Sequence, residues 1–293
     1  VEERFRSQRS GTVLVTGGRG FLGQSVIKKL EEMEVTVSAP PKRDLDLLTG
    51  RAQLDMVVRA QGVARVIHLA NPRVYTSNLA LGETIAMLRN VLEVCALNRL
   101  PLVYISSWEV YSGYRTIGLL ADEALPLFPS GPYGETKFLA ETLINHFRAR
   151  GELNCAIMRL SPVYGEGGER PKFIHTFIEK ARHRKAIATH RYANGSPALD
   201  LLHIDDAAAA ICNVAMRDYS GDLNIGTGQL TTTRQIAEWI VAWTKSDSVL
   251  ETVLLDTDTA CIAMRSDRAR SEIGWEPLIP VVDGLRRLVE AQH

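Results

Sequence analysis

The sequence has no excess of either charge, few cysteines and no long hydrophobic run. Lysine plus arginine and aspartate plus glutamate each number 34 in 293 residues. The formal net charge is therefore zero, and we expect no bulk attraction to nucleic acid or to an anionic membrane. No apolar run reaches the roughly 18 residues of a membrane span, and the first residues lack the apolar core of a signal peptide. We expect no metal site, no disulfide framework and a cytoplasmic protein, because the cysteines lack paired spacing; they are Cys95, Cys155, Cys212 and Cys261.

A glycine-rich turn follows the first apolar stretch of the chain. Residues 1–10 are polar and predict a mobile arm, whereas residues 12–16 are apolar and β-branched and predict a strand. Gly17, Gly20 and Gly23 come next, and an amphipathic helix is predicted after them. A dinucleotide-binding site requires this order, because the N-terminus of the helix offers amide donors to a pyrophosphate. The alternative is an ordinary glycine-rich turn.

The second strand, predicted at residues 35–38, bears on the choice between NAD and NADP. NAD sites usually place an acid about 20 residues after the glycines, whereas NADP sites place arginine near the 2′-phosphate. This strand has no acid at its tip, and Arg19, Lys42 and Arg43 lie in the glycine turn or just after the strand. We therefore expect NADP to be favoured over NAD, although such cations are also typical of solvated loops.

Tyr133 and Lys137 form a candidate proton shuttle. They are four residues apart, so in a helix both side chains project from one face. A lysine ammonium beside a tyrosine favours the phenolate and lowers a pKa that is normally about 10. Residues 102–105 predict a strand that ends in hydroxyls, where open parallel sheets place reactive side chains, and Ser107 is the natural third member. The same spacing also occurs by chance in many helices.

The surroundings of this pair resemble the active-site segment of the extended short-chain dehydrogenase/reductase family, the NAD(P)-dependent epimerases and dehydratases. Residues 132–141 read PYGETKFLAE and follow Asp122 and Glu123, as they do in the family. Further segments resemble the substrate lobe of extended members, in the same order: residues 173–181, 201–206, 223–226 and 273–277.

The resemblance implies an α/β fold, with a Rossmann-type doubly wound parallel sheet and a smaller C-terminal α/β substrate lobe. After the arm, the dinucleotide-binding Rossmann domain is expected at residues 11–165, with parts of 200–228. The substrate-binding lobe is expected mainly at residues 166–293.

The resemblance also implies how the cofactor is bound. Asp46 and Leu47 match the pair that borders the adenine in the family, and residues 66–70 match a strand ending that lies along the cofactor. His68, within that ending, is interpreted as structural rather than as a catalytic base. The expected cofactor contacts are Gly17, Arg19, Gly20, Phe21, Leu22, Gly23, Lys42, Arg43, Asp46, Leu47, Leu69, Ala70, Tyr133 and Lys137.

The catalytic roles follow from the same resemblance. Tyr133 would remove or return the proton of a sugar hydroxyl, Lys137 would assist the tyrosine and hold the cofactor ribose, and Ser107 would stabilise the developing oxyanion. Glu109 matches the proton-abstracting carboxylate of sugar-nucleotide dehydratases and decarboxylases, although a structural strand-end acid is the equal alternative. Trp108 stands where one dehydratase group carries an acidic aspartate, which disfavours that group.

Two departures from the family pattern concern the substrate. Leu199 stands where many nucleotide-sugar members carry an arginine that binds the pyrophosphate, and Pro162 replaces an asparagine of the family. Arg191 or Arg265 could supply a phosphate contact instead, since arginine forks suit phosphate. The candidate substrate-binding residues are Ser107, Trp108, Arg191 and Arg265.

The leading hypothesis is an NAD(P)-dependent epimerase or dehydratase that acts on a nucleotide-activated sugar through a transient keto intermediate. The runner-up is an NADPH-dependent ketoreductase on a sugar or other small carbonyl compound, which does not need Glu109. The third is a non-catalytic NADP-binding regulator, disfavoured because such proteins typically lose the tyrosine or the lysine. Residues 78–98 have helical periodicity and should pack on the sheet or join the Tyr133 helix in a subunit interface. The resemblance to the family, whose members are usually dimers, implies a homodimer.

Overall fold

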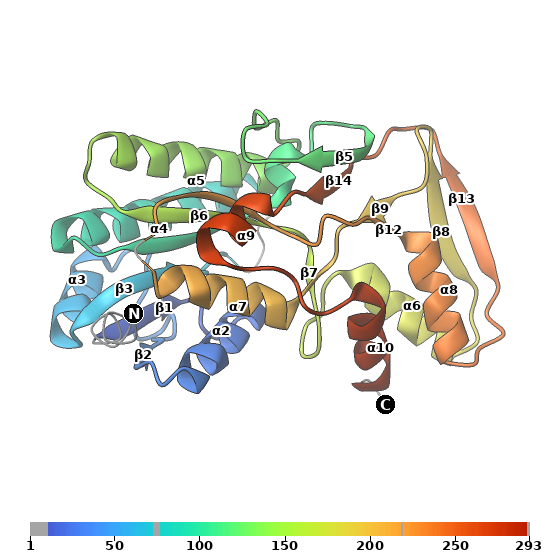
Figure 1. Ribbon diagram of the computed structural model, residues 1–293, viewed down its shortest axis with the longest axis horizontal. Helices are drawn as coiled ribbons and strands as arrows, with labels where there is room; N and C mark the ends of the chain where they lie inside the picture. The colour runs from blue at the N-terminus through green and yellow to red at the C-terminus, as the bar shows by residue number, and fades with distance from the viewer. Residues whose placement is uncertain (1–10, 73–76, 218, 292–293) are drawn as a thin grey trace. The chain divides into compact units, whose positions relative to one another are not determined.

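The computed structural model describes residues 11–72, 77–217 and 219–291 (Figure 1). The predicted N-terminal arm at residues 1–10 lies outside the described residues. The chain forms two compact units. The first unit consists of the described parts of Val1–Val110, Pro129–Arg159 and Ala208–Leu223, and the second of those of Tyr111–Phe128, Leu160–Ala207 and Asn224–His293.

A six-stranded sheet lies at the centre of the first unit, in the order β11-β6-β4-β3-β1-β2. The pairs β1–β2, β1–β3 and β3–β4 are parallel. The chain moves from β1 to β2 on one side and then to β3 on the other, so the carboxyl ends of β1 and β3 form the switch point where such sheets bind ligands. The strands are β1 (Thr12–Thr16), β2 (Val37–Ser38), β3 (Val63–His68), β4 (Leu102–Ser107), β6 (Cys155–Leu160) and β11 (Gly221–Ile225).

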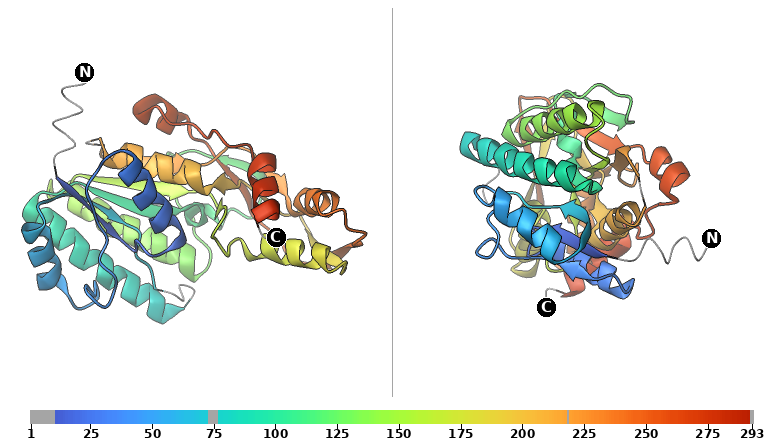
Figure 2. Two further views of the ribbon diagram at one scale, coloured as in Figure 1. Left: turned by 90° about the horizontal axis from the view of Figure 1, so that it is seen from below. Right: turned by 90° about the vertical axis from the view of Figure 1, so that its left-hand side faces the viewer.

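Helices cover both faces of this sheet (Figures 1 and 2). α3, α4 and α5 pack on one face around a cluster of buried apolar side chains that includes Leu54, Leu88 and Ile144. α2 and α7 lie on the other face, where the Cys212 thiol is 3.6 Å from the carbonyl oxygen of Val26. The helices are α2 (Phe21–Glu32), α3 (Arg51–Ala60), α4 (Asn78–Asn98), α5 (Pro132–Ala149) and α7 (Ile204–Ala215).

Most elements predicted for this unit are confirmed, and β2 is shorter than predicted. The strand at residues 12–16 and the helix at residues 78–98 have the predicted bounds, and α4 packs on the sheet. The amide of Val35 donates to Leu30 O and Glu34 has a φ of 59°, so both close the end of α2. Only Val37 and Ser38 are then left to pair with β1.

The second unit contains short sheets and four helices among its described residues. Its pairs β7–β10, β8–β13 and β5–β14 are parallel and β9–β12 is antiparallel. Its apolar core gathers Tyr164, Phe177, Ile236 and Leu285, among others. Together with the sheet of the first unit, this confirms the α/β class with a Rossmann-type sheet. The elements are β5 (Ile117–Ala121), β7 (Val163–Tyr164), α6 (Lys172–Arg182), β8 (Ile187–Tyr192), β9 (Ala198–Leu199), β10 (Leu202–His203), β12 (Thr231–Thr232), α8 (Thr233–Trp243), β13 (Leu250–Leu255), β14 (Cys261–Met264), α9 (Asp267–Ile273) and α10 (Val281–Ala291).

All four cysteines are buried and free. Burial raises the pKa of the thiols, to about 12 for Cys155 and for Cys212. The pKa values of Cys95 and Cys261 are raised for the same reason. Among the residues that the structure describes, no helix has both the length and the apolar character to cross a membrane.

Asp200 organises a loop of the second unit. Its side chain is fully buried, with 0% exposure. The carboxylate accepts hydrogen bonds from the amides of Thr227 at 2.8 Å, Gly228 at 3.1 Å and Met264 at 2.9 Å. A Cβ on Gly226 would lie 2.5 Å from the same carboxylate, so the loop comes this close only with glycine there. Asp200 therefore ties residues 226–228 to β14.

We expect Asp200→Ala to lower the free energy of unfolding by about 3 kcal/mol or more, because one buried and two partly buried amides lose their charged acceptor at about 1 to 3 kcal/mol each. Asp247→Asn is the control in the same unit, since its side chain is 72% exposed in an ion pair with Arg184. That change should cost less than about 0.5 kcal/mol. Urea denaturation followed by circular dichroism measures both, and a wild-type midpoint for Asp200→Ala would contradict the assigned role.

Candidate active site

Four residues with predicted catalytic roles come together at the end of β4. Ser107 is the last residue of that strand, and η1 (Trp108–Tyr111) follows directly and carries Glu109. Tyr133 and Lys137 both lie in α5, so their predicted helical spacing is confirmed. The strand, the helix and the turn as far as Val110 belong to the first unit.

Gly134 allows the first turn of α5 to pack against η1. A Cβ on Gly134 would lie 2.5 Å from the carbonyl oxygen of Glu109 and 3.2 Å from the side chain of Pro129. Side-chain carbons do not approach a carbonyl oxygen that closely, so glycine is required. The residue after Tyr133 thereby determines how near the tyrosine comes to the end of β4.

Ser107 links Tyr133 to the turn. Its hydroxyl forms a side-chain hydrogen bond with Tyr133. It also accepts a hydrogen bond from the amide of Glu109 at 3.2 Å. The serine is buried, with 7% exposure, whereas the tyrosine is partly exposed. A substrate oxygen that reaches Tyr133 would therefore meet the Ser107 hydroxyl as well.

Lys137 is held beneath the tyrosine by the strand. Its Nζ atom donates to the carbonyl oxygen of Ile105 at 2.8 Å and to the hydroxyl of Tyr104 at 3.4 Å. The same atom lies 4.9 Å from the ring centroid of Tyr104 and 5.6 Å from that of Tyr133. Two aromatic rings and a carbonyl thus surround the ammonium group, which is favourable for a cation.

The pKa of Tyr133 is raised, and the lowered pKa predicted from its spacing to Lys137 is not found. Burial raises this pKa most, the charge of Glu109 raises it further, and the hydrogen bond with Ser107 lowers it. Desolvation and the charge of Glu109 together disfavour the phenolate more than the hydrogen bond with Ser107 favours it. Tyr133 therefore keeps its proton at physiological pH, as an unperturbed tyrosine also does, and the protonated form is the one that can donate to a substrate oxygen.

Lys137 and Glu109 influence each other across the site. Burial lowers the pKa of Lys137 to about 8, although the charges of Glu141 and Glu109 raise it. Burial also raises the pKa of Glu109, against the lowering effect of Lys137. A carboxylate with a raised pKa is a stronger base than an exposed one, so Glu109 is suited to remove a proton.

The glycine turn lies at the carboxyl end of β1, against the end of β3. Gly17 has a φ of 72°, and a Cβ there would lie 2.7 Å from the amide nitrogen of Ala70. A Cβ on Gly23 would lie 2.3 Å from the carbonyl oxygen of Gly17. Gly20 is the N-cap of α2 and makes no side-chain capping bond, so the first amides of the helix can bind an anion. These residues fit the pyrophosphate of a dinucleotide.

The other predicted cofactor residues lie around this turn or near it in the first unit. Phe21 and Leu22 form the first turn of α2, and the amide of Leu69 donates to Thr16 O at 3.1 Å. The end of β2 is adjacent too, because a Cβ on Gly18 would lie 2.8 Å from that of Ala39. The turn, the end of β2 and the end of β3 therefore converge at one edge of the sheet.

The three cations predicted near a 2′-phosphate are exposed. Arg19 lies within the glycine turn. The side chains of Lys42 and Arg43 are 79% and 77% exposed, with Asp46 at 3.8 Å from the former and Asp44 at 3.5 Å from the latter. Exposed ion pairs of this kind are weak, so both cations can turn to a phosphate at low cost.

Asp46 and Leu47 also have structural contacts. Asp46 Oδ1 accepts a hydrogen bond from the amide of Leu48 at 2.9 Å. The side chain of Leu47 is buried in the apolar cluster of the first unit. Asn90 of α4 donates to Leu47 O at 2.8 Å, which holds the segment in place. The predicted contact of this pair with adenine stays a prediction.

His68 makes a buried structural contact. Its Nδ1 atom lies 2.7 Å from the hydroxyl oxygen of Thr16, and its ring stacks on Tyr104 at 6.0 Å between centroids. Burial, and to a smaller extent the charge of Lys137, lower the pKa of His68 to about 3. The ring is neutral at physiological pH, in agreement with its structural interpretation.

The predicted substrate-binding residues are divided between the units. Trp108 lies in η1 beside Ser107 and is partly exposed. Arg191 and Arg265 belong to the second unit, where Arg191 is exposed on β8. The Arg265 side chain lies 3.7 Å from Asp122 and 4.0 Å from Asp267. A phosphate contact from either arginine stays a prediction.

Sequence reasoning missed the roles of Tyr104 and Glu141. Tyr104 precedes Ser107 by three positions in β4 and contacts Lys137. Glu141 continues the four-residue spacing of Tyr133 and Lys137 along α5, and this spacing was the available signal. Within the described ranges, no group of three or more His, Cys, Asp or Glu side chains could hold a metal ion.

Similar proteins catalyse three kinds of reaction. The chain is 26% identical to human dTDP-D-glucose 4,6-dehydratase, over 64% of this chain and 55% of the human protein. It is 24% identical to Escherichia coli dTDP-4-dehydro-6-deoxyglucose reductase, over 97% and 98% of the two chains. The crystal structure of Thermus thermophilus UDP-glucose 4-epimerase in complex with NAD has the same fold, with a TM-score of 0.83, 20% identity and coverage of 96% and 98%.

A family model extends over most of the first unit and into the second. The model of the NAD dependent epimerase/dehydratase family matches residues 13–226. The matched residues include the glycine turn, β4, η1 and α5, so they contain the grouping described above. The resemblance predicted from the sequence is confirmed, and the chain belongs to the NAD dependent epimerase/dehydratase family.

Proposed function

We propose that the protein is an epimerase or dehydratase that acts on a nucleotide-activated sugar through a transient keto intermediate. The observation that carries this proposal is the grouping of Ser107, Tyr133, Lys137 and Glu109 at the end of β4. The glycine turn lies at the carboxyl edge of the same sheet. The names of the three similar proteins all specify nucleotide sugars as substrates, which supports this substrate class.

The proposed chemistry assigns one task to each side chain. The bound dinucleotide would accept a hydride from the sugar carbon and return one. Tyr133 transfers the proton of the sugar hydroxyl, and Ser107 donates a hydrogen bond to the same oxygen as charge develops on it. Lys137 keeps a positive charge close to Tyr133 and binds the cofactor ribose. The amides at the start of α2, with Gly17, Gly20 and Gly23, hold the pyrophosphate.

Glu109 separates this proposal from simple reduction. The carbonyl group of a keto intermediate acidifies the neighbouring C–H bond, and removal of that proton requires a base beside the ketone. The raised pKa of Glu109 and its electrostatic coupling to Tyr133 and Lys137 support this role. Trp108 stands in place of a second acid, which favours a mechanism with one carboxylate.

An NADPH-dependent ketoreductase is the second candidate. The neutral phenol of Tyr133 favours it, because reduction of a ketone requires a proton donor. The Escherichia coli reductase supports it as well, since the two chains match over nearly their whole lengths. A non-catalytic NADP-binding regulator is the least supported, because Tyr133 and Lys137 are both present beside Ser107.

We further propose NADP as the preferred dinucleotide and a cytoplasmic homodimer as the working form. Arg19, Lys42 and Arg43, together with the absence of an acid at the end of β2, support NADP. Apolar side chains exposed on α4 and α5 support a dimer, and the buried free cysteines fit a reducing location. The exposed side chains are Leu79 and Leu97 on α4, and Phe138 and Leu139 on α5.

Tyr133→Phe should reduce kcat by about two orders of magnitude or more, because it deletes only the oxygen that carries the proton. Folding and affinity for NADP should stay near wild type. Tyr114→Phe is the matched control, since its hydroxyl bonds to Pro126 O in the second unit. Turnover is measured on UDP-glucose, dTDP-glucose and their 4-keto forms. Activity of Tyr133→Phe within about threefold of wild type would refute the assigned role.

Fluorescence titration should show tighter binding of NADP than of NAD by the wild type. The preference should shrink in Arg19→Ala and Arg43→Ala, because each change removes a cation available to the 2′-phosphate. Arg59→Ala is the control. Arg59 lies in the last turn of α3, where it pairs with Asp55 at 2.9 Å. Tighter binding of NAD by the wild type would overturn the preference.

The Glu109→Gln variant should still exchange hydride with the cofactor but should fail to move a carbon-bound proton. In deuterated water the wild type should incorporate deuterium beside the oxidised carbon, and the variant should not. Glu135→Gln is the control, because Glu135 is exposed in the first turn of α5. If the wild type shows no carbon-bound deuterium and the variant turns over normally, the ketoreductase is favoured. The same result would fit an epimerase that only flips its bound keto intermediate between two hydride transfers.

A further inference from the structure

Tyr133, Lys137 and Glu141 form a row along one face of α5. They follow one another at intervals of four residues, so each lies one turn beyond the last. Lys137 and Glu141 are buried, with 3% and 1% exposure. A carboxylate this deeply buried is costly unless it is paired and fully hydrogen-bonded.

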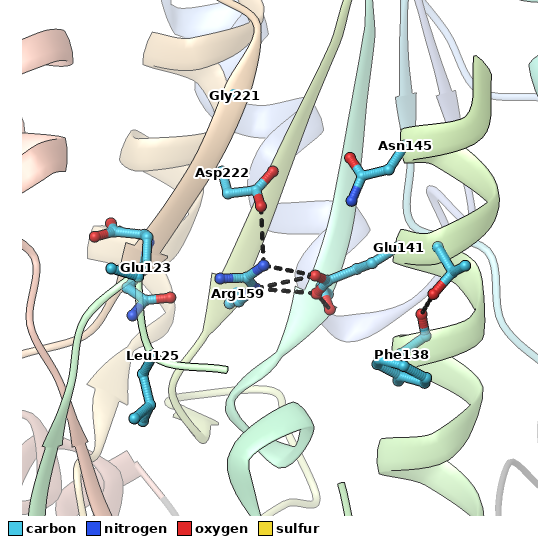
Figure 3. A network of polar contacts seen from close by, with 12 residues as sticks. Glu123, Leu125, Phe138, Glu141, Asn145, Arg159, Gly221 and Asp222 are labelled. Atoms are coloured by element: carbon cyan, nitrogen blue, oxygen red, sulfur yellow. Dashed lines mark hydrogen bonds and ion pairs between the residues drawn. The ribbon is translucent and has the colours of Figure 1, made fainter. Parts of the chain in front are cut away.

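Glu141 has such partners on two strands of the sheet. The hydroxyl of Ser106, the neighbour of Ser107 in β4, donates to Glu141 Oε1. Arg159 of β6 donates from Nη2 to Oε2 at 2.7 Å and from Nε to both carboxylate oxygens at 3.1 Å (Figure 3). Ser106 therefore holds the Glu141 end of this row, while the next residue of β4, Ser107, bonds to Tyr133 at the other end.

The ionic cluster extends to the edge strand. Arg159 Nη2 also donates to Asp222 of β11 at 2.9 Å. Arg148, two turns beyond Glu141 on α5, donates to the same carboxylate at 2.7 Å and to Gly221 O at 2.9 Å. The cluster of Glu141, Arg148, Arg159 and Asp222 contains two charges of each sign and joins α5 to β6 and β11. The hydroxyl of Ser106 adds the link to β4.

We propose that Glu141 is a positioning residue for the proposed reaction: through Ser106 and Arg159 it fixes α5 against β4, so that Tyr133 meets Ser107, and it supplies the negative charge that steadies the Lys137 ammonium. The inference rests on the proposed function. Glu141 itself touches none of the reacting atoms. Its effect on catalysis passes through the position of the helix and the charge on the lysine.

The surroundings of Lys137 explain why a charge is needed at position 141. Four titratable side chains from four elements face the ammonium group of Lys137. They are Glu109 of η1, Tyr133 of α5, Tyr104 of β4 and His68 of β3. Burial lowers the pKa of Lys137 to about 8, and Glu141 is the largest influence that raises it. Without the Glu141 charge, the lysine would lose its proton at lower pH.

The direction of the pH effect follows from the protonated form of Lys137. If the ammonium is the active form, activity is lost as the pH rises through its pKa, which lies at about 8. Removal of the Glu141 charge lowers that pKa. The alkaline limb of the pH profile of kcat should therefore move to lower pH in Glu141→Gln, while KM changes less than kcat.

The experiment compares Glu141→Gln with two variants of the same cluster. Asp222→Asn removes a charge that meets Arg148 and Arg159 but not Ser106. Ser106→Ala removes the link to β4 without changing any charge. Glu141→Asp keeps the charge and should partly restore kcat and the alkaline limb. The readouts are thermal midpoint, the pH profile of kcat on UDP-glucose or dTDP-glucose, and NMR titration of the Lys137 ε-methylene group, which needs no substrate.

Glu141→Gln should reduce kcat by about tenfold or more, shift the alkaline limb and lower the pKa of Lys137 in the NMR titration. Asp222→Asn should lose thermal stability but keep the limb and the lysine pKa. Ser106→Ala should lower kcat with the limb in place. The cluster would be merely structural if the alkaline limb of Glu141→Gln superimposed on that of the wild type. The same conclusion would follow if the alkaline limb of Asp222→Asn shifted as far as that of Glu141→Gln. If Glu141→Gln does not fold, a wild-type kcat in Ser106→Ala overturns the proposal.

The substrate-free titration separates failure of this proposal from failure of the proposed function. A wild type that turns over neither sugar, but whose Lys137 pKa falls only in Glu141→Gln, would refute the proposed substrates and support the positioning role. If the wild type turns over sugar and the pKa of Lys137 is the same in Glu141→Gln, the result would support the proposed substrates and refute the positioning role.

Discussion

The close approach of α5 to the end of β4 is the constraint on which the site depends. At one end of the contact, Gly134 packs on the carbonyl group of Glu109 at a distance that no larger residue permits. Two turns further along, Glu141 is bound to Ser106 and Arg159. The helix is therefore fixed at a steric point and at an ionic point, and Tyr133 and Lys137 lie at one end and in the middle of the fixed stretch. The position of Tyr133 relative to the hydroxyl of Ser107 is therefore set by contacts of α5 at Gly134 and at Glu141.

Burial controls the protonation of the site more than any single charge does. It raises the pKa of Tyr133 and lowers that of Lys137, so both groups are driven toward their neutral forms. Glu109 and Glu141 oppose this effect on the lysine, while Glu109 reinforces it on the tyrosine. The result is a protonated tyrosine beside a lysine whose ammonium group loses its proton more easily than that of an exposed lysine. This combination lets one proton move at the substrate oxygen without leaving an isolated charge in a buried place.

Local patterns in the sequence predicted the elements of the first unit, and tertiary packing determined what the patterns missed. The strand at residues 12–16, the helix at residues 78–98 and the helical spacing of Tyr133 and Lys137 follow from periodicity. The raised pKa of Tyr133 could not be predicted, because desolvation depends on residues distant in the sequence. Asp200, the residue after Leu199, holds a loop through hydrogen bonds to backbone amides that no spacing indicates.

The buried thiols give each unit a built-in reporter of its own opening. Cys95, Cys155 and Cys212 belong to the first unit and Cys261 to the second. Thiol reagents attack the thiolate, and burial keeps these groups both protonated and inaccessible. Each thiol can react only while the surrounding packing is transiently lost. Arg148 of α5 donates a hydrogen bond to the carbonyl oxygen of Cys155, so the modification rate at Cys155 would follow separation of α5 from the sheet. The amide of Ala198 donates to the Cys261 sulfur, so the rate at Cys261 would follow opening near Ala198.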